Sequence, residues 1–168
     1  DHNEFSESQP TAYINWDQNP YKWNNNTSCI DFFTNPISKN LFKNRLRYII
    51  ARWGYSTGIF AFELMNEINQ YTHYWDHDVN RLILRVWQDE MLAYCKTLDN
   101  HHLYTNSTAG IAPEYFGDEN VRLYSSQELD FLQGHYYTRD YNGQTQFNEL
   151  IKLAKHRYNK PYFWGEYG

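Results

Sequence analysis

The stretch Ile59-Phe-Ala-Phe-Glu-Leu-Met-Asn-Glu-Ile-Asn69 decides the fold of this chain. Seven of its eleven residues are apolar, and the polar ones gather toward its end. Such a run is typical of a strand in a parallel sheet that is covered on both faces. Several of these residues also suit a helix, but Gly58 and the β-branched Ile59 favour the start of a strand. We therefore predict a buried strand that ends at Asn66-Glu67.

Side chains on a strand alternate between its two faces, so Glu63, Met65 and Glu67 should share one face. Two carboxylates on a buried face need either partners or a function. A structural interpretation stays open at this point: Glu63 is salt-bridged inside the core, and Glu67 is solvated at the strand end. The functional interpretation is that Glu67 stands at the carboxyl end of a barrel strand, where α/β barrels carry their active sites.

The C-terminal stretch, Lys160-Pro-Tyr-Phe-Trp-Gly-Glu-Tyr-Gly168, repeats this arrangement. A proline is acceptable where a strand begins, and the aromatic residues after it favour a strand. Gly165 would let the backbone pass closely before Glu166. The two glutamates are 99 positions apart, which three strand–helix units of about 30 residues would fill. We expect Glu67 and Glu166 on strands three apart in one barrel, at the same mouth.

The remaining elements alternate between helix and strand. We expect helices at 38–53, 78–98 and 144–158, and further strands at 102–107 and 129–137. This order indicates the α/β class with a parallel sheet. A closed eight-stranded barrel needs about 250 residues, and only four or five strands are visible in these 168. We predict one domain over 1–168 that forms a partial (β/α)8 TIM barrel, with the first strands and the last strand missing.

Two expectations concern the helices. Ser38 can cap the N-terminus of the first one. The helix at 78–98 carries an apolar stripe that we expect to be core packing rather than a cofactor site; it consists of Val79, Leu82, Ile83, Val86, Ala93 and Tyr94.

Composition excludes some classes of function. The net charge is −5 and no basic run is present, which argues against a nucleic-acid partner. No stretch approaches the length of about 18 apolar residues that a membrane span needs. Aromatic residues make up 19% of the chain, which suits either a carbohydrate-binding surface or a tyrosine-rich core. The two cysteines give no disulfide framework, and Cys95 is expected to be a buried thiol.

The polar and aromatic loop at 70–77 follows Glu67 directly, and loops in this position build the rim of a barrel active site. Trp75 is a candidate platform for stacking on a sugar. His73 and His77, with acidic neighbours, leave a metal-dependent hydrolase open. Their spacing matches no recognised metal site, so we expect no metal and no cofactor.

With these residues identified, the chain resembles the clan A glycoside hydrolases, most closely family 5, the cellulases and β-mannanases. Phe62-Glu-Leu-Met-Asn-Glu67 is similar to the motif that ends the family's strand four, His135-Tyr-Tyr137 to the His-x-Tyr of strand six, and Trp164-Gly-Glu166 to the end of strand seven. His2 resembles a histidine at the end of strand three. The resemblance runs from about strand three to strand seven, and the family's strand-two Arg and strand-eight Trp have no counterpart.

This resemblance implies a role for each matching residue. Glu67 would be the general acid/base, and Glu166 the nucleophile. Asn66 would bind the 2-hydroxyl of the substrate, and Tyr137 would donate a hydrogen bond to the nucleophile. His135 and His2 would line the site. The implied reaction is retaining cleavage of a β-1,4-glycan, either β-mannan or a cellulose-like polymer, with the two carboxyl groups about 5–5.5 Å apart.

Two alternatives stay open beside this one. A catalytically inactive barrel fragment could use the same cleft and aromatic residues to bind carbohydrate, and a metal-dependent hydrolase could use His73 and His77. The expected partner is a β-linked polysaccharide or oligosaccharide. Because polymeric glycans are met outside the cell, we expect a secreted, periplasmic or cell-surface protein, although no signal peptide opens the chain.

Overall fold

The computed structural model describes residues 16–70, 78–110, 123–137 and 143–168. Its longer elements, in chain order, are α1 (Asp31–Thr34), α2 (Pro36–Trp53), β1 (Ala61–Glu63), α3 (Asp78–Leu98), β2 (Leu103–Thr105), β3 (Ser107–Ala109), β4 (Leu132–Tyr136), α4 (Gly143–Leu153) and β5 (Tyr162–Tyr167). Short 3₁₀ turns lie at Trp16–Gln18, Pro20–Trp23, Ile68–Gln70 and Leu123–Ser125, and a π-turn at Ala154–Tyr158 continues α4.

All strand pairings in the described residues are parallel. β1 pairs with β2, β3 with β4, and β4 with β5. Asn106 alone separates β2 from β3, and the Ser107 amide donates to the Met65 carbonyl at 3.3 Å, which extends the β1 pairing beyond its regular part. Neighbours in space therefore follow the order of the chain, as in a barrel. The predicted α/β class and partial barrel are confirmed.

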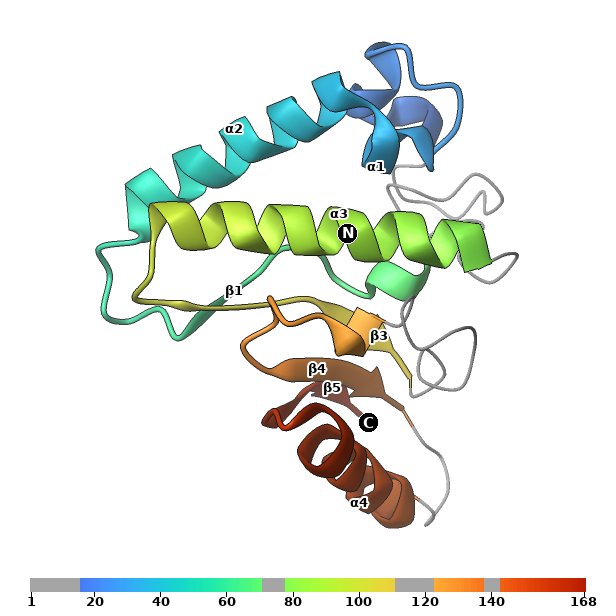
Figure 1. Ribbon diagram of the computed structural model, residues 1–168, viewed down its shortest axis with the longest axis vertical. Helices are drawn as coiled ribbons and strands as arrows, with labels where there is room; N and C mark the ends of the chain where they lie inside the picture. The colour runs from blue at the N-terminus through green and yellow to red at the C-terminus, as the bar shows by residue number, and fades with distance from the viewer. Residues whose placement is uncertain (1–15, 71–77, 111–122, 138–142) are drawn as a thin grey trace.

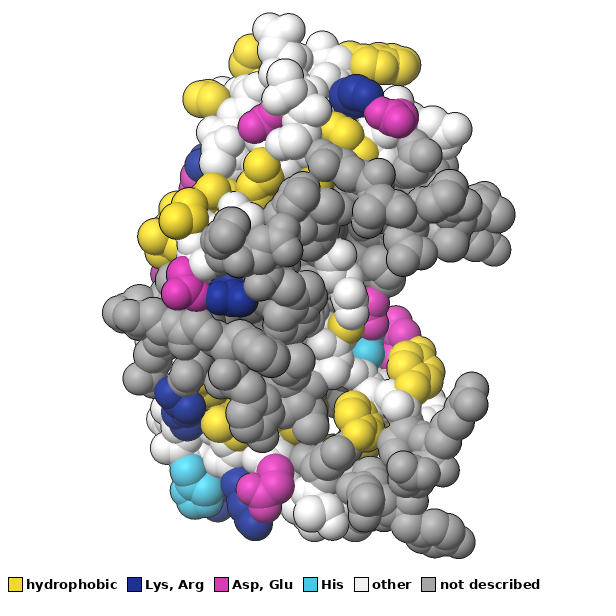
Figure 2. Space-filling view, turned by 90° about the vertical axis from the view of Figure 1, so that its right-hand side faces the viewer, with side chains coloured by type: hydrophobic (Ala, Val, Ile, Leu, Met, Phe, Trp, Pro, Cys, Tyr) yellow, Lys and Arg dark blue, Asp and Glu magenta, His cyan; other side chains and the backbone are white. Residues whose placement is uncertain are grey.

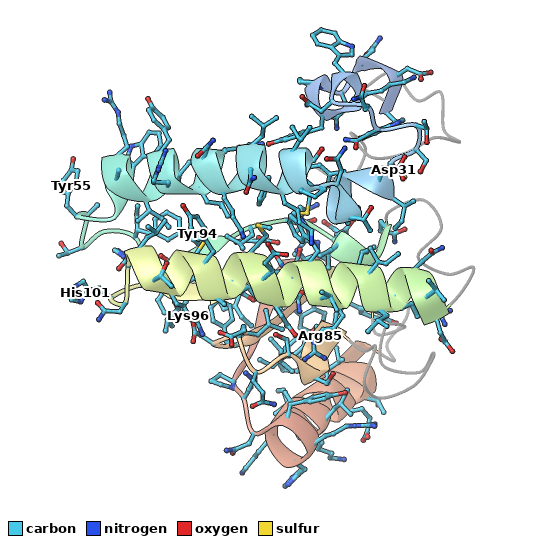
Figure 3. All side chains as sticks on the ribbon, turned by 45° about the horizontal axis from the view of Figure 1, so that its top comes forward. Asp31, Tyr55, Arg85, Tyr94, Lys96 and His101 are labelled. Atoms are coloured by element: carbon cyan, nitrogen blue, oxygen red, sulfur yellow. The ribbon has the colours of Figure 1, made fainter. Side chains whose placement is uncertain are left out.

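The helices form a layer outside the strands (Figure 1). α2 and α3 lie side by side over β1 and β2, and α4 covers the strands at the other end of the row. Glu90 on α3 joins the two neighbouring helices by accepting from Lys39 at 2.8 Å and from Lys43 at 2.6 Å. Arg85 and Lys96 extend from α3 toward the lower strands (Figure 3), where Lys96 donates to Asp130 at 2.9 Å.

The helix predicted over 38–53 begins two residues earlier, at Pro36. Its N-cap is Asn35, whose side-chain oxygen accepts from the Ile37 amide at 2.8 Å, so the expectation that Ser38 caps the helix is wrong. Proline is preorganised for the first helical position, which places the cap before it. Ser38 is instead fully buried and accepts from Asn26 at 2.7 Å.

α3 spans the predicted residues, but the stripe expected to be core is only partly covered: Ile83 and Tyr94 pack against the core, whereas Val79, Leu82 and Val86 are exposed. Val79 is 66% exposed and Val86 is 51% exposed. The buried stripe holds Leu84, Trp87, Met91, Leu92 and Cys95. It contains the largest apolar side chains of the helix, and burying them removes more apolar area from water. The Trp87 ring packs on three phenylalanine rings, those of Phe32, Phe33 and Phe42.

The C-terminal helix and strand match their predictions closely. Leu150 and Ala154 are buried, while Ile151 is 39% exposed. Phe147 stacks on Trp164 of β5 with ring centroids 4.7 Å apart. Trp164 therefore faces the helix layer, an orientation that fixes which face of β5 the following residues occupy.

Both cysteines are free and buried, as predicted for Cys95. Burial raises the pKa of the Cys95 thiol to about 12, with a further contribution from the Asp99 charge. Among the described residues, no helix is long and apolar enough to cross a lipid bilayer.

Candidate active site

Glu67 follows β1 in an unusual backbone conformation. Its φ is +48°, in the left-handed region that residues with a β-carbon rarely adopt. The Glu67 amide donates to the Ser107 hydroxyl at 2.8 Å, which holds the backbone in place. Its side chain is only 14% exposed. The period of two that predicted its face does not apply, because the regular strand ends at Glu63.

Polar side chains connect this turn to the neighbouring strand. Asn106 accepts from the Met65 amide at 2.9 Å and donates to Gln88 on α3 at 3.1 Å. Asn69 both donates to and accepts from the backbone of Ala109, at 2.9 and 2.7 Å. The segment from 65 to 69 therefore stays bonded to β3 although it is no longer a strand.

His135 occupies the next position in the site. It lies near the carboxyl end of β4 and is 4% exposed. Its Nδ1 is 2.9 Å from Glu67 Oε1 and 3.5 Å from Glu166 Oε1. The short distance to a carboxylate indicates that Nδ1 carries a hydrogen and donates a hydrogen bond to Glu67.

Glu166 reaches the site because β5 carries a bulge. Gly134 pairs with Trp164, but His135 pairs with Glu166, so Gly165 is the extra residue. Regular alternation would put Glu166 on the same face as Trp164, toward the helices. The extra residue turns Glu166 to the opposite face, beside His135. A β-carbon on Gly165 would lie 2.7 Å from Gln133 Nε2 and 3.0 Å from His135 Nε2, so a larger residue would displace these side chains or the bulge itself. The predicted close approach at Gly165 is confirmed.

Tyr137 completes the group. Its hydroxyl donates to Glu166 Oε2 at 2.5 Å. This hydrogen bond raises the pKa of the Tyr137 phenol, and the nearby carboxylate charges act in the same direction. Tyr137 thus remains a neutral hydrogen-bond donor to Glu166 at ordinary pH.

Three strands therefore deliver one cluster. Ligand atoms of Glu67, His135 and Glu166 all lie within 4.8 Å of one another. The space-filling view shows a hollow in which acidic side chains and a histidine gather, beside exposed apolar side chains (Figure 2). His135 is at the bottom, while Glu166 is 44% exposed and thus accessible from solvent.

We tested whether this cluster fits a metal ion. Ligand atoms around a tetrahedral zinc are about 3.4 Å apart, given bonds near 2.1 Å. The His135 Nδ1 distances to the two carboxylates are 2.9 and 3.5 Å, but the cluster as a whole spreads to 4.8 Å. Nδ1 is also engaged as a donor to Glu67. The two carboxylates would have to move together, so the arrangement suits two carboxyl groups that act on opposite sides of a bond better than a zinc site.

The structure brings together Glu67, His135, Tyr137 and Glu166 from the predicted set. Asn66 is half-buried directly before Glu67. Trp75 and His2 lie outside the described residues, as do His73 and His77 of the metal alternative. Sequence reasoning missed Ser107 and Gln133. The signals were available, because Ser107 belongs to a polar run at a strand end and Gln133 is two positions before His135 on the same face.

Comparison with known proteins finds similar sequences among mannan endo-1,4-β-mannosidases. The chain is 30% identical over 164 residues to mannan endo-1,4-β-mannosidase 5 of Solanum lycopersicum, a match that covers 85% of this chain and 38% of that protein. It is 32% identical over 149 residues to mannan endo-1,4-β-mannosidase 4 of Oryza sativa subsp. japonica, covering 84% and 30%. The resemblance to glycoside hydrolase family 5 is confirmed.

Another relative is mannan endo-1,4-β-mannosidase 5 of Arabidopsis thaliana, 30% identical over 171 residues, with coverage of 86% of this chain and 37% of that protein. The chain thus spans well under half the length of the curated relatives it matches. A solved structure, the hyperthermostable endo-1,4-β-D-mannanase of Thermotoga petrophila RKU-1, superposes with a TM-score of 0.62 at 21% identity, covering 88% of this chain and 49% of that one. This likeness supports the partial barrel fold. No family model matches the chain.

Proposed function

We propose that the protein is a retaining glycoside hydrolase that cleaves β-1,4-linked mannan. One observation carries the proposal: carboxylates from the ends of β1 and β5 approach within 4.8 Å around His135, at the carboxyl ends of parallel strands. Glycosidic cleavage needs two carboxyl groups that flank the scissile bond. Barrel enzymes assemble their active sites at this end of the strands.

The separation of the glutamates supports retention of configuration. In retaining enzymes the two carboxyl groups are about 5–5.5 Å apart, whereas inverting enzymes need about 6.5–9.5 Å to admit a water molecule. The closest oxygens of Glu67 and Glu166 fall at the short end. Such a distance leaves no room for a water molecule between the carboxylate and the sugar. Glu166 itself would therefore attack the anomeric carbon.

In the first step, the Glu67 carboxyl group donates its proton to the glycosidic oxygen while a Glu166 oxygen attacks the anomeric carbon. The bond from the anomeric carbon to the leaving oxygen breaks, and an ester bond to Glu166 forms. In the second step, Glu67 takes a proton from water, the hydroxide attacks the anomeric carbon, and the ester bond breaks. Both glutamates return to their starting states.

The neighbours of the two glutamates suit this division of roles. Glu67 is the more enclosed, with 14% of its side chain exposed against 44% for Glu166. Tyr137 binds Glu166 Oε2 and thereby leaves Oε1 to attack. His135 bridges the two carboxylates and sets their orientation.

The choice of mannan rests on the named activity of the relatives. Mannan and cellulose-like polymers differ at one hydroxyl, and the three relatives described above carry the name mannan endo-1,4-β-mannosidase. We further propose that the protein acts outside the cell, where polymeric glycans are met.

Reducing-sugar release from β-mannan, cellulose and mixed-linkage glucan tests the proposal in the full-length protein. Mannan should be hydrolysed fastest, and proton NMR of the fresh product should show the β-anomer. Glu166→Gln and Glu67→Gln should each lower kcat/KM by roughly 10³-fold or more. With an activated aryl β-mannoside, whose leaving group needs no general acid, azide should restore turnover to Glu67→Ala, because it is a nucleophile that needs no general base.

Glu149→Gln provides a matched control, because this glutamate is exposed on α4 and binds only Lys152 of its own helix in the described contacts. It should keep full activity. An α-anomeric product would exclude the double displacement. If a folded protein binds mannan without releasing reducing sugar, the proposal is wrong and a carbohydrate-binding barrel takes its place.

A further inference from the structure

A third carboxylate, Glu63, lies on the same side of the sheet as the candidate active site and takes no part in the proposed reaction. It ends the regular part of β1 and its side chain is exposed in the described structure. Both of its oxygens accept hydrogen bonds from other strands. The alternative interpretation of Glu63 as salt-bridged inside the core is wrong in the part of the chain that the structure describes, because its donors there are a backbone amide and a side-chain amide.

The first hydrogen bond of Glu63 connects it to Glu67 through Ser107. Glu63 Oε1 accepts from the Ser107 amide at 3.2 Å, and that amide also donates to the Met65 carbonyl at 3.3 Å. The Ser107 hydroxyl in turn accepts from the Glu67 amide at 2.8 Å. Ser107 thus connects Glu63 to the residue whose left-handed φ places the candidate acid/base.

The second bond leads to Glu166. Glu63 Oε2 accepts from Gln133 Nε2 at 3.0 Å. Gln133 is 7% exposed, and its Nε2 would lie 2.7 Å from a β-carbon at Gly165. The Gln133 side chain therefore lies against the bulge in β5 that turns Glu166 into the site.

From these two connections we infer that Glu63 is a positioning residue that sets the separation of Glu67 and Glu166. The Glu63 carboxylate binds Ser107, which holds the Glu67 amide, and Gln133, which lies beside the bulge that carries Glu166. The inference rests on the proposed function for its kinetic consequence. Its geometric part concerns the backbone at Glu67 and holds for any activity of this site.

Two substitutions separate this role from simple stability. Glu63→Ala removes both acceptors and should lower kcat by about 10- to 100-fold, because small displacements of reacting groups are costly, while KM changes by less than about threefold. Glu63→Gln keeps an acceptor for Ser107, and the Gln133 amide can turn so that its oxygen accepts from the new amide group. It should keep kcat within about threefold of wild type.

Two controls accompany these variants. Gln133→Ala breaks only the second hydrogen bond, so it should lower kcat by less than Glu63→Ala does. The double variant should lower kcat by less than the product of the two single effects. Glu149→Ala removes a carboxylate on α4 that binds only Lys152 in the described contacts, and it should leave kcat unchanged. Melting temperatures measured in parallel identify general destabilisation.

Amide hydrogen exchange gives a readout that needs no catalysis. In Glu63→Ala the Glu67 amide should exchange roughly tenfold faster or more, while amides of α3 keep their protection. The inference is overturned by unchanged kcat together with unchanged Glu67 exchange, by equal kcat losses in Glu63→Ala and Glu63→Gln, or by faster exchange throughout the chain. If the wild type hydrolyses no glycan, the proposed function fails, and Glu67 exchange alone then decides the role of Glu63.

Discussion

The sequence contains His-x-Tyr three times. The copy at 156–158 lies in the π-turn after α4, and the other two lie at opposite ends of the strands. His102-Leu103-Tyr104 opens β2, and His135-Tyr136-Tyr137 closes β4. Each histidine and each tyrosine contacts a carboxylate: Asp99 in the first case, and Glu67 or Glu166 in the second. The same three residue types therefore form two clusters, one at β2 in the sheet β1-β2 and one at β4 in the sheet β3-β4-β5.

The cluster at the amino ends of the strands is closed. Asp99 accepts from the His101 amide at 2.8 Å, from His102 Nδ1 at 2.6 Å and from the Tyr104 hydroxyl at 3.2 Å. The other ring nitrogen, His102 Nε2, is 3.1 Å from the Ser56 carbonyl. Tyr55 and His101, the sequence neighbours of this cluster, are at one end of the molecule in Figure 3. Side-chain exposure is only 8% for His102 and 5% for Asp99.

The cluster at the carboxyl ends is open on one side. Glu166 is 44% exposed and Tyr137 is 64% exposed, although His135 beneath them is buried. A substrate can reach carboxylates here, whereas the oxygens of Asp99 are enclosed by protein donors. The comparison shows that residue types alone do not identify an active site. The position at the carboxyl ends of the strands and access from solvent distinguish the active-site cluster, in line with the separation of stability and catalysis between the two ends of a barrel.

Matched histidine substitutions should give the largest contrast. His135→Ala should lower kcat/KM by about 10²–10³-fold, since it removes the group that orients both glutamates. His102→Ala should lower the melting temperature, because it removes both its bond to Asp99 and its bond to the Ser56 carbonyl, and should leave kcat/KM of the folded enzyme unchanged. The contrast between the two clusters is wrong if His102→Ala lowers kcat/KM and His135→Ala lowers only the melting temperature. Mannan hydrolysis and thermal unfolding measure them.

Gly165→Ala should be the next largest effect. The added β-carbon would lie 2.7 Å from Gln133 Nε2 and 3.0 Å from His135 Nε2. The Gln133 and His135 side chains or the bulge must then shift, and the displacement of His135 or Glu166 should cost roughly 100-fold in kcat. Gly58→Ala is the control, since a β-carbon there meets nothing closer than 3.6 Å. Equal activity of the two variants would show that the bulge does not position Glu166.

The two tyrosines sharpen the contrast further. Tyr137→Phe removes a donor to Glu166 and should lower kcat about tenfold, with little change in stability, because the hydroxyl is solvent-accessible. Tyr104→Phe removes a buried donor to Asp99 and should cost about 1 kcal/mol of unfolding free energy without changing kcat. Kinetics and chemical denaturation of both variants measure the two effects. A kcat loss in Tyr104→Phe would contradict the structural role of the closed cluster.

The smallest effect is a pH dependence of stability at the closed cluster. The hydrogen bond to the Ser56 carbonyl and the bond to Asp99 raise the pKa of His102 above its ordinary value. Because the folded state favours the protonated ring, this stabilisation is fully present below the unfolded pKa, about 6.5, and is lost as pH rises through the folded pKa.

Melting temperatures of wild type and His102→Gln, measured from about pH 6 to about pH 9, should therefore converge at the alkaline end. His156→Gln is a control on the exposed surface of the π-turn and should follow the wild-type profile. A difference between wild type and His102→Gln that grows with pH would contradict the raised pKa.

The order of elements could be predicted from sequence because it depends on local pattern. Apolar runs, aromatic strands and helical periodicity predicted these strands. β4 and β5 end within one residue of the predicted Tyr137 and Glu166, whereas β1 ends four residues before Glu67. The buried stripe of α3 could not be chosen in the same way. That helix has two apolar stripes, and only the phenylalanine rings packed on Trp87 decide which of them is covered.

Sequence by itself predicted that two parallel strands lead to glutamates and that both glutamates lie at the same mouth of a barrel. Tertiary structure decided how the two side chains reach each other. The backbone turns at Glu67, whose left-handed φ is held by Ser107, and Glu166 turns into the site through a bulge at Gly165, which packs against Gln133 and His135. Both devices depend on atoms of neighbouring strands far away in the sequence, and an alternation rule applied along a single strand contains no information about them.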